Sequence, residues 1–296
     1  MKDVYDIFLK NSYNSILGVT VIDSGKPGKN IGILGITHGN EPVGLQVFDF
    51  LVHDFKISEK LQKGKLFLIA NNIEAYKKYR ESKDPNAYRF LDNNLNRITH
   101  QTFQNESYEH RRFAELKTIF HEIDTVIDLH SVSKGNDIIG ITDKKYRENA
   151  KKFFNVETIL IDDVSKTGAI IGEFLRKGKQ GYGLECGNHI SHDGFEKGKE
   201  NVLNFLGFFG YIQQKIRKNH YDEIYEFIEE IRVKTKNFTF TKKVGEGFTK
   251  IKKGEIYARD GKENLTNTFH QEIFVGIPTK KPIIGDGAGF LFFKKQ

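Results

Sequence analysis

Two histidines and one glutamate have the residue types and spacing that a catalytic metal ion needs. His38 and Glu41 stand three positions apart in Thr37-His38-Gly39-Asn40-Glu41-Pro42, and His130 closes the later segment Thr125-Val126-Ile127-Asp128-Leu129-His130. Two imidazoles and one carboxylate form the three-ligand set of a catalytic zinc ion, which keeps its fourth position open for water. An H-x-x-E pair by itself is weak in a chain with 10 histidines, so the prediction depends on what positions these residues.

The predicted strands place all three side chains at strand ends. Residues 31–36 form a short apolar run that stops at Thr37, and residues 125–130 form a second buried run. Binding groups in open α/β sheets collect at the carboxyl edge of the strands, so we expect His38, Glu41 and His130 to hold one zinc ion. Taken singly, each has an ordinary alternative: a hydrogen-bonded loop histidine, a first-turn helix carboxylate and a satisfied core histidine.

Glu185 ends a third predicted strand, residues 181–186, at the same edge. A glutamate beside a metal-bound water can take its proton and pass it to the leaving amine, and burial raises its pKa to suit both steps. The alternative is a structural carboxylate bonded to backbone amides. Cys186 points to the opposite face by strand alternation, so we interpret it as a packing residue.

A long polar stretch, residues 71–99, supplies Arg89, Asn96 and Arg97. A connection of that length in a compact domain is usually functional or partly structured. One guanidinium can bind a carboxylate through two parallel hydrogen bonds, and the other can stabilise the oxyanion that forms at the scissile carbonyl. Ordinary surface ion pairs are the alternative.

The order of predicted elements indicates an α/β fold. Helices are expected after Pro42 and at about 106–122, 145–154, 168–177 and 195–218, and strands at 31–36, 66–70, 125–130, 137–141, 158–161 and 181–186. Such alternation favours a mixed, mostly parallel sheet with helices on both faces. Residues 233–296 alternate Thr, Lys, Phe and Ile among glycines. We therefore predict an α/β domain over residues 1–220, which carries the zinc-dependent hydrolase site, and a small β-rich C-terminal domain over residues 221–296.

The charge is concentrated in that C-terminal part. Residues 233–296 carry 13 Lys/Arg against 6 Asp/Glu, which accounts for the formal net charge of +7, and the rest of the chain is neutral. The basic residues are scattered without a nucleic-acid-binding signature, so we expect no nucleic acid partner. No apolar run reaches the roughly 20 residues of a membrane span and no signal peptide is evident. We expect a cytoplasmic protein, compatible with a homo-oligomer.

The ordered segments Gly35–Glu41, Leu95-Asn96-Arg97, Asp128-Leu129-His130 and Leu184-Glu185 resemble the succinylglutamate desuccinylase and aspartoacylase family, relatives of the zinc carboxypeptidases. The resemblance covers about residues 30–190 and extends to the glycine-punctuated tail. It implies that His38, Glu41 and His130 bind zinc, that Glu185 is the general base and acid, and that Arg89 polarises the amide carbonyl. It also implies that Asn96 and Arg97 bind the carboxylate of a small anionic N-acyl amino acid, with Arg176 as an additional anion contact.

Two departures from the family pattern bear on the substrate. Aspartoacylases read Asp-Leu-Asn-Arg where this chain has Asn94-Leu95-Asn96-Arg97, which removes a carboxylate that could orient the neighbouring arginine. The aromatic residues of 285–293 are all phenylalanines, in the region where aspartoacylases contribute a tyrosine. The sequence therefore predicts zinc-dependent hydrolysis of an N-acyl amino acid or similar N-acylated amine. The alternatives are a zinc carboxypeptidase acting on peptides and, from another class, a metal-containing protein that binds nucleic acid through its basic tail.

Overall fold

The structure is a computed structural model that describes residues 4–99, 107–133, 135–189, 191–216, 223–241, 243–245, 247–279 and 282–295. No helix within these ranges is long and apolar enough to cross a membrane.

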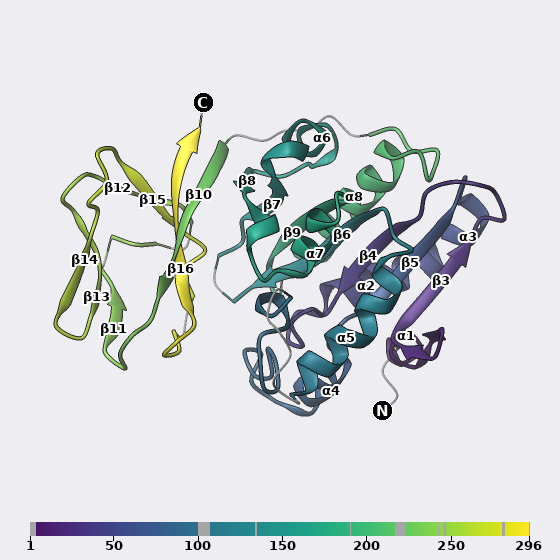
Figure 1. The fold of residues 1–296 in the computed structure, drawn as a ribbon, viewed down its shortest axis with the longest axis horizontal. Helices are drawn as coiled ribbons and strands as arrows, with labels where there is room; N and C mark the ends of the chain where they lie inside the picture. Colours follow the sequence, from purple (N-terminus) through teal and green to yellow (C-terminus); the bar gives the residue numbers. More distant parts are fainter. Residues whose placement is uncertain are drawn as a thin grey trace.

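One large mixed sheet organises the molecule (Figure 1). Its eleven strands run in the order β12-β15-β16-β10-β8-β7-β9-β6-β4-β5-β3. In the α/β part the pairs β4·β5, β4·β6, β6·β9 and β7·β8 are parallel, whereas β3·β5 and β7·β9 are antiparallel. The bounds of these strands are β3 Val19–Asp23, β4 Ile31–Gly35, β5 Lys65–Ala70, β6 Thr125–Val132, β7 Ile138–Asp143, β8 Thr158–Asp162 and β9 Gln180–Asn188.

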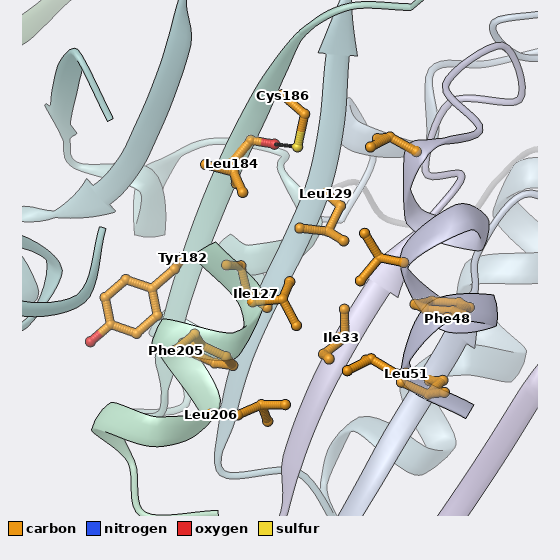
Figure 2. Packing of buried hydrophobic residues seen from close by; sticks show 14 of the residues in the cluster. Ile33, Phe48, Leu51, Ile127, Leu129, Tyr182, Leu184, Cys186, Phe205 and Leu206 are labelled. Carbon is orange, nitrogen blue, oxygen red and sulfur yellow. Dashed lines mark hydrogen bonds between the residues drawn. The ribbon is translucent and has the colours of Figure 1, made fainter. Parts of the chain in front are cut away.

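Helices cover both faces of this sheet, as the alternation of elements predicts. Phe48 and Leu51 pack with Phe205 and Leu206 over one face of the strands (Figure 2). The other face packs against Phe113, Leu116 and Phe174. The helices are α1 Asp6–Lys10, α2 Val43–Asp49, continued by a π-helical segment Phe50–Asp54, α3 Ile57–Lys60, α4 Ile73–Glu81, α5 Tyr108–Phe120, α6 Arg147–Phe153, α7 Ile170–Arg176 and α8 His192–Phe208.

The C-terminal strands join the same sheet. β10 pairs in parallel with β8 and antiparallel with β16, and β12 and β15 extend the sheet beyond them. A separate three-stranded sheet, β11-β13-β14, packs alongside. The bounds are β10 Glu223–Arg232, β11 Phe238–Phe240, β12 Thr249–Ile251, β13 Ile256–Asp260, β14 Glu263–Thr266, β15 Ile273–Gly276 and β16 Gly287–Lys295. Because the sheet is continuous across the predicted boundary near residue 220, the division into two domains stays a prediction.

Several expected elements have different limits in the structure. The helix predicted to reach residue 218 ends at Phe208, and Gly210 follows with a φ of 70°, a conformation in which glycine commonly terminates helices. The polar stretch after Asn71 contains α4, whose apolar side is limited to Ile73, Ala75 and Tyr76. The short strands β1 Ser12–Tyr13 and β2 Ile16–Leu17, and the edge strand β3, were not predicted.

Candidate active site

The loop after β4 is shaped to bring two polar side chains to the edge of the sheet. Ile36 adopts a positive φ of 48°, unusual for a β-branched residue. A Cβ at Gly39 would lie 2.5 Å from the Tyr88 carbonyl oxygen, so only glycine allows this close approach. The Gly39 amide donates to the Arg89 carbonyl at 2.9 Å. The loop with His38 and Glu41 is thereby fastened to the backbone of Arg89.

The structure brings the three predicted ligands together, although their roles stay predictions. His38, Glu41 and His130 are all buried, and one potential ligand atom from each lies within 4.8 Å of the other two. His38 Nδ1 is 2.9 Å from Glu41 Oε1, and His130 Nδ1 is 2.8 Å from Glu41 Oε2. The two Nδ1 atoms are 3.2 Å apart. Both imidazoles therefore present the same ring nitrogen to the carboxylate.

The other ring nitrogen of each histidine has its own acceptor. His38 Nε2 donates to Asn94 Oδ1 at 3.1 Å, and His130 Nε2 donates to Asp128 Oδ2 at 2.8 Å. A hydrogen bond to an outer partner fixes the tautomer of a metal-binding histidine. With the protons on Nε2, the Nδ1 lone pairs of both rings are available to a cation.

A buried chain of hydrogen bonds supports His130. Thr37 Oγ1 donates to Asp128 Oδ1 at 2.7 Å, and Asn71 Nδ2 donates to Thr37 Oγ1 at 2.7 Å. All three residues are buried. The chain links the ends of β4, β5 and β6, so the orientation of His130 depends on three neighbouring strands.

Burial and nearby charges shift the pKa values of His38, Glu41 and His130. Burial and the Arg89 guanidinium lower the pKa of His38 to about 4. Burial opposes ionisation of Glu41 and of His130, but contact with opposite charge prevails: His38 and Arg89 hold the pKa of Glu41 well below its usual range, while Asp128 and Glu41 raise that of His130. Glu41 is therefore held as a carboxylate, and a buried carboxylate beside two imidazoles attracts positive charge.

Glu185 lies beside this group because of the strand register. His130 and Glu185 are direct partners in the parallel pair β6·β9. Burial raises the pKa of Glu185 to about 7, with the Glu41 charge acting in the same direction and His130 opposing it. Its Oε2 atom is buried and has no hydrogen-bond partner among the described residues. Its neighbour Cys186 is buried on the opposite face in the apolar cluster, as strand alternation predicts (Figure 2).

The donor set fits a divalent metal ion. Imidazole nitrogens and a carboxylate suit zinc and similar transition metals, and three protein donors leave room for a further ligand. Glu185 Oε2 also indicates that the site receives an additional polar ligand, because a buried polar oxygen normally has a partner and this atom has none among the described residues. The buried His38-Glu41-His130 group can therefore hold a metal ion.

Arg89 reaches the same group. Its Nη1 donates to Glu41 Oε1 at 2.6 Å, and its side chain remains 38% exposed. The guanidinium therefore stands between the buried carboxylate and the open side of the site.

Asn96 and Arg97 have partners of their own. Asn96 Oδ1 accepts from the Ile170 amide at 2.9 Å at the start of α7. Arg97 Nε lies 3.7 Å from Glu230 Oε1 on β10, and burial lowers the pKa of Arg97. An arginine expected to bind substrate thus faces a carboxylate from the C-terminal part of the chain, which local sequence did not indicate.

Asn94 and Arg176 have partners that the sequence did not indicate. Asn94 Oδ1 accepts from His38 Nε2 and from the Asn96 amide at 3.0 Å, so this position of the motif orients a histidine. Arg176, expected as an anion contact, donates from its guanidinium to the carbonyls of Ser165 and Thr167, to Thr99 Oγ1 and to Glu173, and its role toward an anion stays a prediction.

Other residues near the site were missed. His189 lies 2.8 Å from Ser131 Oγ through its Nδ1 atom. Ser131 follows His130 and donates its amide to Glu41 Oε2 at 3.2 Å. Asp128 could have been found, because it lies two residues before His130 and therefore on the same face of the strand.

The family profile described as the succinylglutamate desuccinylase/aspartoacylase catalytic domain matches residues 27–204, more than half of the chain. A search of curated proteins found no match.

Solved structures share the fold at low sequence identity. A succinylglutamate desuccinylase from Vibrio parahaemolyticus superposes with a TM-score of 0.74 at 17% identity, covering 94% of this chain and 86% of that one. The ectoine utilization protein EutE (DoeB) from Ruegeria pomeroyi gives 0.69 at 15% identity, covering 94% and 88%. An aspartoacylase family protein from Mesorhizobium loti gives 0.64 at 14% identity, covering 98% and 93%. The fold extends through the C-terminal strands, and the profile match shows that this chain belongs to the succinylglutamate desuccinylase/aspartoacylase family.

Proposed function

We propose that this protein is a zinc-dependent deacylase that hydrolyses the amide bond of an N-acyl amino acid or a similar small N-acylated amine. The observation that carries the proposal is the convergence of His38, Glu41 and His130 beside Glu185, whose buried Oε2 atom has no partner in the described part of the chain. Family membership supports deacylation as the reaction class. Zinc, the bond type and the substrate are our inference.

Glu185 is the proton carrier in this proposal. Zinc held by the three donors would supply Lewis-acid activation of water and of the scissile carbonyl. A carboxyl group with a pKa of about 7 accepts a proton from water and returns it to the leaving amine with little loss of driving force in either direction. Its buried position excludes competing solvent.

The arginines and Asn96 would bind the substrate. Arg89 is partly exposed and adjacent to Glu41, which suits a donor to the carbonyl oxygen as negative charge develops. Arg97, 36% exposed in its side chain, and the Nδ2 group of Asn96 would receive the carboxylate of the amino acid. Two guanidinium groups and one amide donor favour a small substrate with a negative charge.

The Glu185→Gln variant tests the proton-carrier role. The amide has nearly the same shape but accepts no proton at neutral pH, so we expect turnover to fall by about 10²-fold or more while zinc content by elemental analysis is unchanged. Glu196→Gln on the surface of α8, where Glu196 pairs with Lys199, is the matched control. Substantial activity of the Glu185→Gln variant would contradict the assignment.

A substrate panel separates the proposed deacylase from a carboxypeptidase. The zinc-loaded protein should hydrolyse N-acetyl and N-succinyl amino acids faster than short unblocked peptides of the same C-terminal residue. Release of free C-terminal amino acids from the peptides, with no hydrolysis of the N-acyl compounds, would favour the carboxypeptidase.

A further inference from the structure

A buried glutamate outside the metal group binds the loop that carries the predicted substrate residues. Glu109 lies in the first turn of α5 and is 0% exposed. Its Oε1 atom accepts from the Leu91 amide at 2.7 Å, and its Oε2 atom accepts from the amides of Asp92 and Asn93 at 3.1 Å each. One carboxylate therefore binds three consecutive backbone amides of the loop.

The contact between loop and helix is reciprocal. Asp92 Oδ2 accepts from the Tyr108 amide at 2.9 Å at the start of α5. Asn72, immediately before α4, donates from its Nδ2 atom to Glu109 Oε1 at 3.4 Å. The helix carboxylate thus binds the loop amides, a loop carboxylate binds a helix amide, and the connection between β5 and α4 contributes a further donor.

The energetics of burial couple this contact to the shape of the loop. A carboxylate removed from water is stable only when hydrogen-bond donors replace the water, and the three loop amides supply most of those donors. If the loop moved, Glu109 would lose its partners, and the amides would lose a charged acceptor. The buried charge therefore disfavours other loop conformations.

The bound amides lie between the residues predicted to bind substrate. Arg89 precedes Leu91 by two positions, and Asn96 and Arg97 follow Asn93 by three and four. The metal donors, in contrast, come from the loop after β4 and from β6. Asn94 and Arg89 of this loop contact His38 and Glu41, but the loop supplies none of the three donors, so a change at Glu109 should alter substrate binding more than zinc stoichiometry.

We propose that Glu109 is a positioning residue that sets the conformation of the loop of residues 89–97 for substrate binding. The proposal rests on the proposed function for the part played by Arg89, Asn96 and Arg97. The contact between Glu109 and the loop amides can be tested without it.

Amide hydrogen exchange in the wild-type protein is the first test. The amides of Leu91, Asp92 and Asn93 should be protected by at least 10²-fold relative to an unstructured peptide, although they lie in a loop. Exchange at the unstructured rate would overturn the proposal without any variant.

The Glu109→Gln variant is the second test. Its amide nitrogen cannot accept hydrogen bonds, so one or two of the three loop amides lose their acceptor, and exchange over residues 89–97 should accelerate. We expect kcat/KM for an N-acyl amino acid to fall at least tenfold, mainly through a higher KM, with zinc stoichiometry unchanged. Glu115→Gln makes the same chemical change on α5 next to Arg112 and should leave exchange of the loop and KM as in the wild type.

The outcomes separate positioning from a purely structural role. A rise in KM with faster loop exchange and full zinc content supports the proposal. Wild-type KM and exchange in the Glu109→Gln variant, or parallel loss of zinc, activity and folded protein, contradicts it. If the wild type hydrolyses no N-acyl amino acid, the proposed function fails, and the exchange measurements alone decide whether Glu109 holds the loop.

Discussion

The two histidines of the metal group differ in their outer partners, and this difference predicts opposite effects of two substitutions. His130 donates to the carboxylate of Asp128, whereas His38 donates to the amide of Asn94. A carboxylate partner makes the imidazole a stronger ligand. Asp128→Asn should therefore weaken metal binding, and Asn94→Asp should strengthen it.

The magnitude follows from the hydrogen bonds that change. The Asp128 carboxylate is 1% exposed and accepts from both His130 and Thr37. Hydrogen bonds to charged groups contribute about 1.5–3 kcal/mol and neutral ones about 0.5–1.5 kcal/mol. Loss of the Asp128 charge should therefore weaken zinc binding by about 1–2 kcal/mol. That corresponds to a Kd for zinc raised about 5–30-fold. Asn94 is only half-buried, so the gain from Asn94→Asp should be smaller.

Competition with a chelator of known zinc affinity measures both effects at one pH. The double variant Asp128→Asn/Asn94→Asp exchanges the two partners and should recover only part of the zinc affinity that Asp128→Asn loses. Thr37→Val, which removes the next donor in the chain, should weaken binding less than Asp128→Asn. Unchanged affinity of a folded Asp128→Asn variant, or shifts of the two single variants in the same direction, would refute the reasoning.

Three further perturbations test other parts of the structure. Burial raises the pKa of Asp162 from its ordinary value of 3.8 to about 6. Ionisation of Asp162 therefore disfavours the folded state, and the protein loses stability as the pH rises from about 4 to about 6. Asp162→Asn should increase the free energy of unfolding by about 1–3 kcal/mol at pH 8 and by almost nothing at pH 3.5, and urea titrations showing equal gains at both pH values would contradict this. Glu230→Gln removes the carboxylate that faces Arg97 and leaves the guanidinium available to the substrate, so KM for N-acyl amino acids should fall about 2–5-fold, as expected for a partly exposed pair. Steady-state kinetics that gave a higher KM would show instead that Glu230 helps to bind the substrate. Gly39→Ala places a Cβ 2.5 Å from the Tyr88 carbonyl oxygen, so it should lower the free energy of unfolding by about 1–3 kcal/mol and reduce the zinc content. Thermal unfolding and metal analysis measure the two effects. The control Gly245→Ala, where the nearest atom is 3.9 Å away, should change neither quantity.

Local sequence was sufficient for the elements whose signal lies within a few residues. Short apolar runs ending in polar residues predicted β4, β6 and β9, and the rule that binding groups collect at carboxyl edges placed His38, Glu41, His130 and Glu185 at one edge. Strand alternation predicted the buried position of Cys186. These inferences needed only the period of the backbone and the type of residue at each strand end.

Tertiary structure decided the contacts between residues far apart in the chain. Glu109 is an unremarkable first-turn helix residue in the sequence, and only the approach of the loop gives its carboxylate three amides to bind. Glu230 and Arg97 meet because β10 pairs with β8, a parallel pairing that no local pattern specifies. Asn94 faces His38 for the same kind of reason. The sequence by itself determined which candidate groups lie at the sheet edge. Long-range packing determined which partners orient them, because a hydrogen bond depends on the distance between side chains in space and not on their separation along the chain.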